Sequence, residues 1–416
     1  MKDVIFYGAG RNVQTVYGSL SPSYKLISAP PSLERGLCFV DMDEKKIGTT
    51  YFGLPVLSVD EAIVKYPEAK FYVTLGEVGI YNIFHFLANE KKIATERIID
   101  YVPVERRISC RGDNTLTLFQ QKMFLCWFDE MQLGDARPSI PFGDDYGENV
   151  ENFLAFTKRY RERSKEELCA NCRNAIEAYF PVDVKYRQVK WMEFNNVKCN
   201  FRCHYCGWHK KGFVFDRSAR ELDFPLLIEE LKDRKSLSGS VSSAFGDGEI
   251  TIHPKKSEYV RTLMDNRFSY QILTNAGIYD DEIAELLRNQ HGFLNVSLDS
   301  GTREYFEKIK GVDKFDQVVS NCARYTEYAE RKCVYLKYVF VVGENCDIES
   351  VNGFVKAVNA INPAKVILSF DYNDQHDEDM VRKSLDSVQI LLEQLRASKT
   401  NVSVAQAIRN ALEKIA

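Results

Sequence analysis

The chain has 416 residues, a formal net charge of -4 and a hydrophobic content of 45%, which predicts two or three domains with sizeable cores. The charge balance lacks the basic footprint of nucleic-acid binding, and no apolar run approaches the ~20 residues of a membrane helix. The chain opens on a strand-like pattern and not on a secretory signal, so we expect a cytoplasmic protein whose eleven cysteines are reduced.

Residues 1–102 alternate short apolar runs with helix-like stretches, a pattern typical of a parallel α/β sheet. The expected strands are Val4–Tyr7, Leu37–Val40 and Phe71–Leu75. Gly8 and Gly10 follow the first strand, where glycines permit a tight turn whose amides can face a phosphate. Asp41 ends the second strand, where a ribose-binding acid would sit. Val13 occupies the third glycine position of GxGxxG, so a Rossmann-like domain whose glycines only shape the turn is an equal alternative.

The next segment, residues 103–188, is expected to be a mostly helical bridge. Large apolar side chains predict a buried helix from Leu116 to Met131, and a charged amphipathic pattern predicts another from Val150 to about Arg163. Prolines and glycines between them predict a loop over residues 134–148.

The bridge also carries a CxxC pair, Cys169 and Cys172. Together with Cys110 and Cys126 it could form a second metal site of four thiolates, either zinc or an auxiliary iron–sulfur cluster. Cys126 lies in an apolar stretch, where free cysteine is a common small hydrophobe, so ordinary thiols are slightly favoured.

A loop with the pattern CxxxCxxC, residues 199–206, follows an apolar run from Trp191 to Val197. We call it the cysteine loop, and its cysteines are Cys199, Cys203 and Cys206. Thiolates suit iron–sulfur clusters, and a four-iron cluster held by three cysteines leaves one iron open to bind a reactant. Structural zinc takes a closed set of four ligands. His204 and His209 could complete such a set, so a zinc loop is the minority alternative.

The spacing of the cysteine loop, with Tyr205 before its last cysteine, resembles the signature of the radical S-adenosylmethionine (radical SAM) family. Further segments resemble that family's later elements, in order and at consecutive strand ends. They are Gly246-Asp247-Gly248-Glu249, Thr274-Asn275-Ala276-Gly277, Ser297-Leu298-Asp299-Ser300 and Asn345. Asp247 and Ile250 depart from the family's usual glycine and proline. The resemblance covers roughly residues 190–372.

Residues 189–396 are expected to form six strand–helix units, so the fold class is α/β throughout. Parallel units of this kind curl into a partial (β/α)6 TIM-like barrel with its chemistry at the carboxyl ends of the strands. After the Trp191 strand, the expected strands are Val241–Phe245, Phe268–Leu273, Phe293–Leu298, Val334–Val342 and Val366–Phe370. A final helix is expected within residues 397–416, from Ser403 to Ile415.

The resemblance implies a [4Fe-4S] cluster on the three cysteines and S-adenosyl-L-methionine (SAM) bound at the open iron. It implies that Glu249 accepts a hydrogen bond from the SAM ammonium, that Tyr205 lies near adenine, and that Ser297 and Asn275 reach the ribose or the carboxylate. The other implied SAM contacts are Gly246, Asp247, Gly248, Thr274, Asp299 and Asn345. The implied reaction cleaves SAM reductively to a 5′-deoxyadenosyl radical that abstracts hydrogen from a substrate. An external flavodoxin or ferredoxin would supply the electron.

We expect a small anionic or nucleotide-bearing substrate, such as a sugar nucleotide. The run Val40–Asp43 and the following Gly53–Leu57 loosely resemble the nucleotide-binding domains of bacterial sugar-modifying enzymes. Asp371, at the end of the sixth expected strand, is a candidate substrate contact, and Lys337 could project into the barrel.

Three alternatives stay open. One is a radical SAM peptide-modifying enzyme, although no cysteine follows Cys346 to build the carboxyl-terminal cluster domain common in such relatives. The other two belong to different classes of protein: an iron–sulfur redox sensor and a zinc-stabilised nucleotide-binding module.

Overall fold

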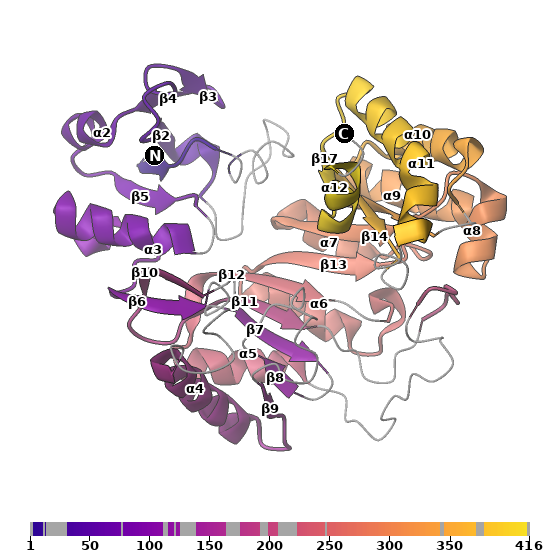
Figure 1. Cartoon of the computed structure of the whole chain (residues 1–416). Helices are drawn as coiled ribbons and strands as arrows, with labels where there is room; N and C mark the ends of the chain where they lie inside the picture. The colour runs from indigo at the N-terminus through magenta and orange to yellow at the C-terminus, as the bar shows by residue number, and fades with distance from the viewer. Residues whose placement is uncertain are drawn as a thin grey trace. The chain divides into compact units, whose positions relative to one another are not determined.

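The computed structural model describes most of the chain: residues 3–10, 13, 31–75, 78–110, 115–119, 122–124, 139–163, 175–191, 199–206, 223–245, 248–341, 345–371 and 378–413. The chain divides into two compact units, and Figure 1 labels their helices and strands. Unit 1 comprises Met1–Met192, Leu222–Ala244 and Arg261–Ser269, and unit 2 comprises Glu193–Glu221, Phe245–Val260 and Tyr270–Ala416. The four domains expected from the sequence, with their boundaries, stay predictions.

Unit 1 begins with a five-stranded sheet in the order β3-β4-β2-β1-β5. Its strands are β1 Val4–Tyr7, β2 Gly36–Val40, β3 Thr50–Tyr51, β4 Leu54–Leu57 and β5 Lys70–Val73. β1 pairs in parallel with β2 and β5, which confirms the parallel α/β sheet predicted for this segment. All four side chains of β1 are buried, as expected for a parallel strand covered on both faces.

Helices cover one face of this sheet. They are α2 Val59–Lys65, α3 Val78–His85 and the π-helical turn η2 Phe86–Glu90, and the 3-10 turns η1 Leu33–Arg35 and η3 Thr95–Arg97 flank strands. Ile5 and Tyr7 pack in the cluster that contains α2 and α3 side chains, whereas Val4 and Phe6 pack in a second cluster. This alternation follows from the two-residue period of a strand.

The rest of unit 1 contains more strand than the sequence pattern predicts. Its elements are β6 Val104–Cys110, β7 Thr115–Phe119, β8 Lys122–Phe124, β9 Ser139–Pro141, α4 Tyr146–Arg163, β10 Ala175–Pro181, β11 Tyr186–Trp191, α5 Phe224–Asp233 and β12 Leu237–Phe245. β6 pairs antiparallel with β10, and β11, β7, β8 and β9 are successive neighbours in a sheet. The charged helix expected from Val150 is confirmed as α4.

The helix expected over 116–131 is wrong where the structure describes it, because residues 115–119 and 122–124 are strands. β7 alternates threonine with leucine, and Thr115, Leu116, Thr117 and Leu118 are all buried. The alternation of threonine with leucine has the two-residue period of a strand, but the large apolar residues of the whole stretch, aromatic ones included, gave it a helical appearance. The expectation of a mostly helical bridge fails for the same reason.

Unit 2 is built on parallel strands in the order β13-β14-β15-β16-β17. They are β13 Ser269–Thr274, β14 Gly292–Ser297, β15 Val334–Phe340, β16 Lys365–Phe370 and β17 Val402–Val404. The first four confirm strands expected from the sequence. The carboxyl-terminal helix begins later than expected, because Ser403 pairs with Ile367 as part of β17.

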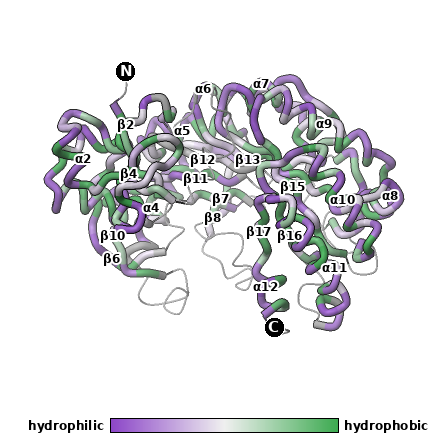
Figure 2. Tube along the Cα trace, turned by 90° about the horizontal axis from the view of Figure 1, so that it is seen from above, coloured by the Kyte–Doolittle hydropathy of each residue, from purple (hydrophilic) through white to green (hydrophobic). Residues whose placement is uncertain are grey.

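The helices that accompany these strands are η6 Ile250–Ile252, α6 Lys256–Asp265, α7 Asp281–Asn289, α8 Arg303–Lys310, α9 Phe315–Tyr328, α10 Ile348–Ile361, α11 Glu378–Ala397 and α12 Gln406–Glu413. Figure 2 shows hydrophobic residues along β16 and β17 and many hydrophilic residues along the neighbouring helices. Tyr338 of β15 packs against Phe354 of α10. Within the described residues, no helix combines the length and apolarity needed to cross a membrane.

Candidate functional site

The cysteine loop rests on the last turn of α8. The N–H of Arg202 donates to the Lys310 carbonyl at 2.9 Å, and the N–H of His204 donates to the Ile309 carbonyl at 3.1 Å. The last carbonyls of a helix have no partner within it, so the loop satisfies them. Gly311 ends the helix with φ +68°, and a Cβ there would lie 3.0 Å from the Arg202 oxygen. Glycine therefore permits both the turn and the close approach.

The three cysteines of the loop are partly exposed. Burial raises the pKa of the Cys199 and Cys203 thiols, and the Cys206 N–H donates to the Cys203 carbonyl at 3.1 Å. Across the described part of the chain, no three His, Cys, Asp or Glu side chains gather as ligands of one metal ion. His204 directs its Nδ1 to the Lys308 carbonyl at 3.4 Å.

Glu249 lies in a cradle of donors at the start of η6 and is only 2% exposed. Its Oε1 accepts hydrogen bonds from the Thr251 amide at 3.1 Å, the Thr251 hydroxyl at 2.8 Å and the Thr274 hydroxyl at 2.7 Å. From the described residues its Oε2 accepts one, donated by the Asn275 backbone amide at 2.7 Å. Burial raises the pKa of Glu249, and these hydrogen bonds offset only part of that effect. A carboxylate oxygen can accept more than one hydrogen bond, so Oε2 keeps capacity for another donor.

The segment after β13 joins this carboxylate to the cysteine loop. The Asn275 side-chain amide donates to Asn200 Oδ1 at 2.6 Å and lies 3.6 Å from the Cys199 sulfur. Gly277 packs under Phe201, whose ring would lie 2.6 Å from a Cβ at that position. The structure therefore brings Cys199, Glu249 and Asn275 close together.

Asp299, at the end of β14, is fully buried and adopts a left-handed conformation with φ +54°, a strained arrangement that often marks functional sites. Its Oδ1 accepts the Val339 amide at 2.8 Å, and its Oδ2 accepts the Tyr205 hydroxyl and the Lys310 ammonium, the latter at 2.5 Å. Ser297, two residues earlier, is partly exposed at the end of the same strand.

Asn345 lies behind this carboxylate and is also fully buried. Its side-chain NH2 donates to the carbonyls of Asp299 and Val339, each at 2.7 Å, and its Oδ1 accepts the Val341 amide at 2.9 Å. The side chain ties the end of β15 to the end of β14.

Lys337 lies on the face of β15 opposite the helices. Its neighbour Tyr338 packs on α10, and side chains alternate along a strand. Lys337 is aligned with Ser297 on β14 and Ile367 on β16. Burial lowers the pKa of Lys337, opposed by the charges of Asp299 and Asp371.

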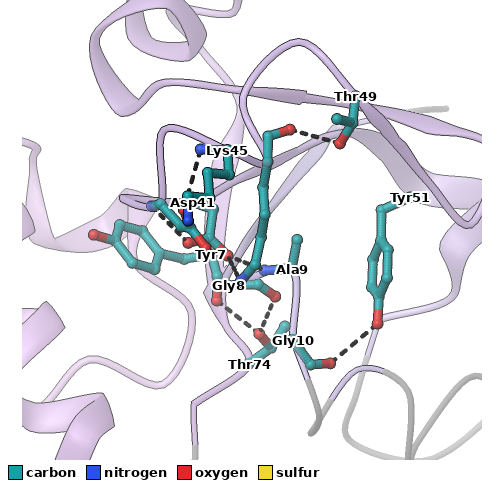
Figure 3. A network of polar contacts seen from close by, with 11 residues as sticks. Tyr7, Gly8, Ala9, Gly10, Asp41, Lys45, Thr49, Tyr51 and Thr74 are labelled. Carbon is teal, nitrogen blue, oxygen red and sulfur yellow. Dashed lines mark hydrogen bonds and ion pairs between the residues drawn. The ribbon is translucent and has the colours of Figure 1, made fainter.

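A second candidate site lies at the turn after β1 (Figure 3). Asp41 Oδ2 accepts the Ala9 amide and the Lys46 ammonium, each at 2.9 Å. Burial acts to raise the pKa of Asp41, but these hydrogen bonds and one from the Asp43 amide hold it below its usual value. The structure thus brings Asp41 to the Gly8–Gly10 turn. A phosphate or ribose would compete with Asp41 for Ala9 and Lys46.

Thr74 and Tyr51 brace the same turn. Thr74 Oγ1 lies within hydrogen-bond distance of the Tyr7 and Gly8 carbonyl oxygens, at 2.7 and 2.8 Å. The Tyr51 hydroxyl donates to the Gly10 carbonyl at 3.2 Å. Gly8 has φ +102°, and a Cβ there would lie 2.9 Å from Thr74 Oγ1, so glycine is required at this position.

Several expected site residues lie outside the described residues. They are Gly246, Asp247, Cys126, Cys169, Cys172 and His209. The predictions of a second metal site and of the first half of the glycine element therefore stay predictions. Gly248 is described and has φ +72°.

The sequence patterns missed Thr251 and Lys310. Thr251 supplies two of the four donors to Glu249. Lys310 is a lysine on the buried side of a helix, next to buried Ile309 and before the glycine that ends the helix. A charge at a core position is a signal that could have marked it, because buried lysines are almost always paired.

These features define an α/β domain whose strand ends present a thiol-rich loop and a buried carboxylate, as in cofactor-dependent enzymes. Residues 196–351 match the family model described as the radical SAM superfamily. The chain therefore carries a radical SAM domain, and enzymes with this domain use a [4Fe-4S] cluster and SAM.

Curated relatives match only part of the chain. An uncharacterised protein of Archaeoglobus fulgidus is 28% identical over 178 residues, 41% of this chain and 37% of that protein. A probable GTP 3′,8-cyclase of Saccharolobus islandicus is 30% identical over 122 residues, 29% of this chain and 38% of that protein. The aligned segments thus span less than two fifths of these relatives.

Solved structures show weaker likeness. Streptococcus suis SuiB bound to its precursor peptide SuiA has 12% identity and a TM-score of 0.44, covering 75% of each chain. The enzyme anSMEcpe with bound AdoMet has 17% identity and a TM-score of 0.42, covering 52% of this chain and 63% of that one. Scores at this level do not define a shared fold.

Proposed function

We propose that this chain is a radical SAM enzyme in which Cys199, Cys203 and Cys206 hold a [4Fe-4S] cluster and Glu249 receives the SAM ammonium. The observation that carries the proposal is the Glu249 carboxylate. It is buried, its pKa is raised by burial, and within the described residues it forms no ion pair. A buried carboxylate without a counter-ion is costly. A cationic ligand at Oε2 would remove that cost.

When bound, the two cofactors supply reductive cleavage of SAM to a 5′-deoxyadenosyl radical, which abstracts a hydrogen atom from the substrate. The chain positions the reactants and excludes water. Thr251, Thr274 and Asn275 hold the Glu249 carboxylate in one orientation. Asn275 also fixes the cysteine loop beside it.

The roles of the remaining residues belong to the same proposal. Gly246, Asp247 and Gly248 would bring backbone close to SAM, Tyr205 would face adenine, and Ser297 would reach the ribose. Asp299 and Asn345 would act on SAM indirectly, because their polar atoms already bind Lys310, Tyr205 and backbone groups. The partial (β/α)6 barrel is the finer form of the fold, and the parallel order of β13 to β16 supports it.

The substrate in this proposal is a small anionic or nucleotide-bearing molecule. Lys337 supports the choice of an anionic substrate, since it is a lysine paired in register with Ser297 near the end of β14. The partial match to probable GTP 3′,8-cyclases is in keeping with a nucleotide. A nucleotide could also bind at the Gly8–Gly10 turn if it displaced the Asp41 contacts.

The test of the proposed function is SAM turnover. The protein is purified anaerobically, reconstituted with iron and sulfide, and reduced with dithionite in the presence of SAM. We expect 5′-deoxyadenosine from the wild type and its loss in Cys203→Ala, while Cys322→Ala, at a buried cysteine of α9, retains it. A colourless, zinc-loaded wild type that leaves SAM intact would overturn the proposal.

The substrate class is tested in the same assay. GTP, a sugar nucleotide such as UDP-glucose, and a mixed peptide pool are each added to wild type and to Lys337→Met. We expect one of the two nucleotides to accelerate 5′-deoxyadenosine formation and the acceleration to fall at least tenfold in Lys337→Met. Acceleration by peptides alone would favour the peptide-modifying alternative.

A further inference from the structure

A triad of Lys310, Asp299 and Tyr205 joins the cysteine loop, through its half-buried Tyr205, to the buried Lys310 and Asp299. The side chain of Lys310 is 3% exposed and that of Asp299 is 0% exposed. The Lys310 ammonium lies 2.5 Å from Asp299 Oδ2 and donates to the Tyr205 hydroxyl at 2.8 Å. The Tyr205 hydroxyl also donates to Asp299. Each of the three groups therefore contacts the other two.

We propose that Lys310 is a positioning residue that fixes Tyr205 in the cysteine loop and, together with Asp299, sets the charge beside the cluster. The inference rests on the proposed function, because it concerns the same cysteine loop. It goes further because it states that two buried charges outside the cysteine motif, those of Lys310 and Asp299, shift the reduction potential of the cluster.

Geometry connects Lys310 to the loop in two independent ways. Its backbone carbonyl accepts the Arg202 amide at 2.9 Å. Its ammonium binds the Tyr205 hydroxyl and lies 5.1 Å from the centre of the Tyr205 ring. Tyr205 stands between Cys203 and Cys206, so one lysine constrains the loop before and after its central cysteine.

The other end of the triad is anchored to the strands. Asp299 accepts the Val339 amide at 2.8 Å through Oδ1, which leaves Oδ2 for Lys310 and Tyr205. The αL conformation of Asp299 is held by Asn345, which binds its carbonyl oxygen at 2.7 Å. The triad thus fastens the cysteine loop to the ends of β14 and β15.

The charges of Lys310 and Asp299 should affect how easily a cluster on the cysteine loop is reduced. Reduction adds an electron to the cluster, so a nearby cation favours the reduced form and a nearby anion opposes it. Lys310 and Asp299 are fixed, buried and of opposite sign. Loss of the lysine charge should lower the midpoint potential, and loss of the aspartate charge should raise it.

The experiment compares reconstituted wild type with Lys310→Met, Asp299→Asn, the double variant and Lys310→Arg. The measurements are iron content and the midpoint potential of the cluster, followed by EPR during redox titration without SAM. We expect a more negative potential in Lys310→Met and a more positive one in Asp299→Asn. The double variant should return toward the wild-type value, and Lys310→Arg should keep it. Lys308→Met, at an exposed lysine of the same helix, is the charge-matched control.

Shifts of the same sign in both single variants, or no shift, would overturn the inference, since damage to the fold has no reason to follow the sign of the charge. If Lys310→Met does not fold, the inference is tested by the other two variants. The midpoint potential should then be more positive in Asp299→Asn and unchanged in Lys310→Arg. A wild type that binds no iron would refute the proposed function itself. A normal wild-type cluster with unshifted variants would refute only the role of Lys310.

Discussion

The buried carboxylate of Glu249 is the side chain on which the proposed SAM site depends. Four donors orient its carboxylate, yet burial still raises its pKa. Such a group binds a cation well only when it is ionised, so its raised pKa should appear directly in the affinity for SAM.

We predict that SAM affinity falls as the pH is lowered through the raised pKa of Glu249, by about tenfold per pH unit below it. Protonation removes the charge that holds the ammonium. Glu249→Gln should bind SAM about 10- to 100-fold more weakly near neutral pH, since a hydrogen bond to a charged group contributes about 1.5–3 kcal/mol. Isothermal titration of the reconstituted protein across pH measures both effects. An equally steep pH dependence in Glu249→Gln would assign the effect to another group.

At this scale the sequence predicts the residues that belong to motifs but not those that support them. Glu249, Asn275 and the three cysteines come from segments that resemble motifs of the radical SAM family. Thr251 and Lys310 do not, because their roles depend on contacts between segments distant in the chain. Asn345 and Asp299 were expected only as SAM contacts, and their buried hydrogen bonds to backbone groups became visible only in three dimensions.

At the scale of elements, close backbone contact sets the position of the segment after β14. Gly301 follows Asp299 by two residues, and a Cβ there would lie 1.8 Å from the Ser350 oxygen and 2.1 Å from the Phe354 nitrogen of α10. These are backbone atoms of a helix, so they cannot move aside independently. The contact fixes the end of β14 against α10.

We predict that Gly301→Ala destabilises the protein by about 3 kcal/mol or more, at the upper end of the usual cost of overpacking. Gly79→Ala is the matched control. It lies in α3, where the new Cβ meets Leu75 at an ordinary 3.4 Å, and alanine should stabilise the helix by about 0.5–1 kcal/mol. Urea unfolding of both variants measures the difference. A Gly301→Ala protein as stable as wild type would show that the approach of α10 is not tight.

Most strands and helices could be predicted from their apolar runs, and β7 and β8 could not. The strands β13 to β16 lie close to their expected bounds, because each is a short apolar run bounded by turn or helix signals. The strands β7 and β8 were mistaken for a helix, because the prediction followed the large apolar residues of the whole stretch and not the alternation of threonine with leucine in β7.

At the scale of the whole molecule, stability should depend on pH through a buried histidine. Burial, with a smaller effect from Arg331, lowers the pKa of His291 to about 3. A histidine in the unfolded chain has a pKa near 6.5, so below that pH the unfolded state binds more protons than the folded state. The stability contributed by neutral His291 is present above pH ~6.5 and is lost as the pH falls.

We predict that His291 alone makes the free energy of unfolding about 2–3 kcal/mol lower at pH ~4.5 than at pH ~6.5, at about 1.4 kcal/mol per pKa unit. Between these two pH values, the free energy of unfolding of His291→Gln should fall by about 2–3 kcal/mol less than that of the wild type. Urea unfolding of both proteins at the two pH values tests this. Equal losses would mean that His291 is protonated in the folded state or exposed to solvent.

The radical SAM domain accounts for residues 196–351, and the amino-terminal sheet lies outside that segment. The parallel sheet there could be predicted from alternating apolar runs. Its ligand could not, because Asp41, Ala9 and Lys46 already satisfy one another, and motif spacing alone does not reveal such internal contacts.

The most direct measurement of the central claim is the low-temperature EPR spectrum of the reduced, reconstituted protein before and after SAM is added. Wild type should give a [4Fe-4S]+ signal whose shape changes when SAM binds at the open iron. Glu249→Gln should keep the cluster signal and respond to SAM only weakly. An absent cluster signal, or an equal response in the two proteins, would contradict a SAM site built on the cysteine loop and Glu249.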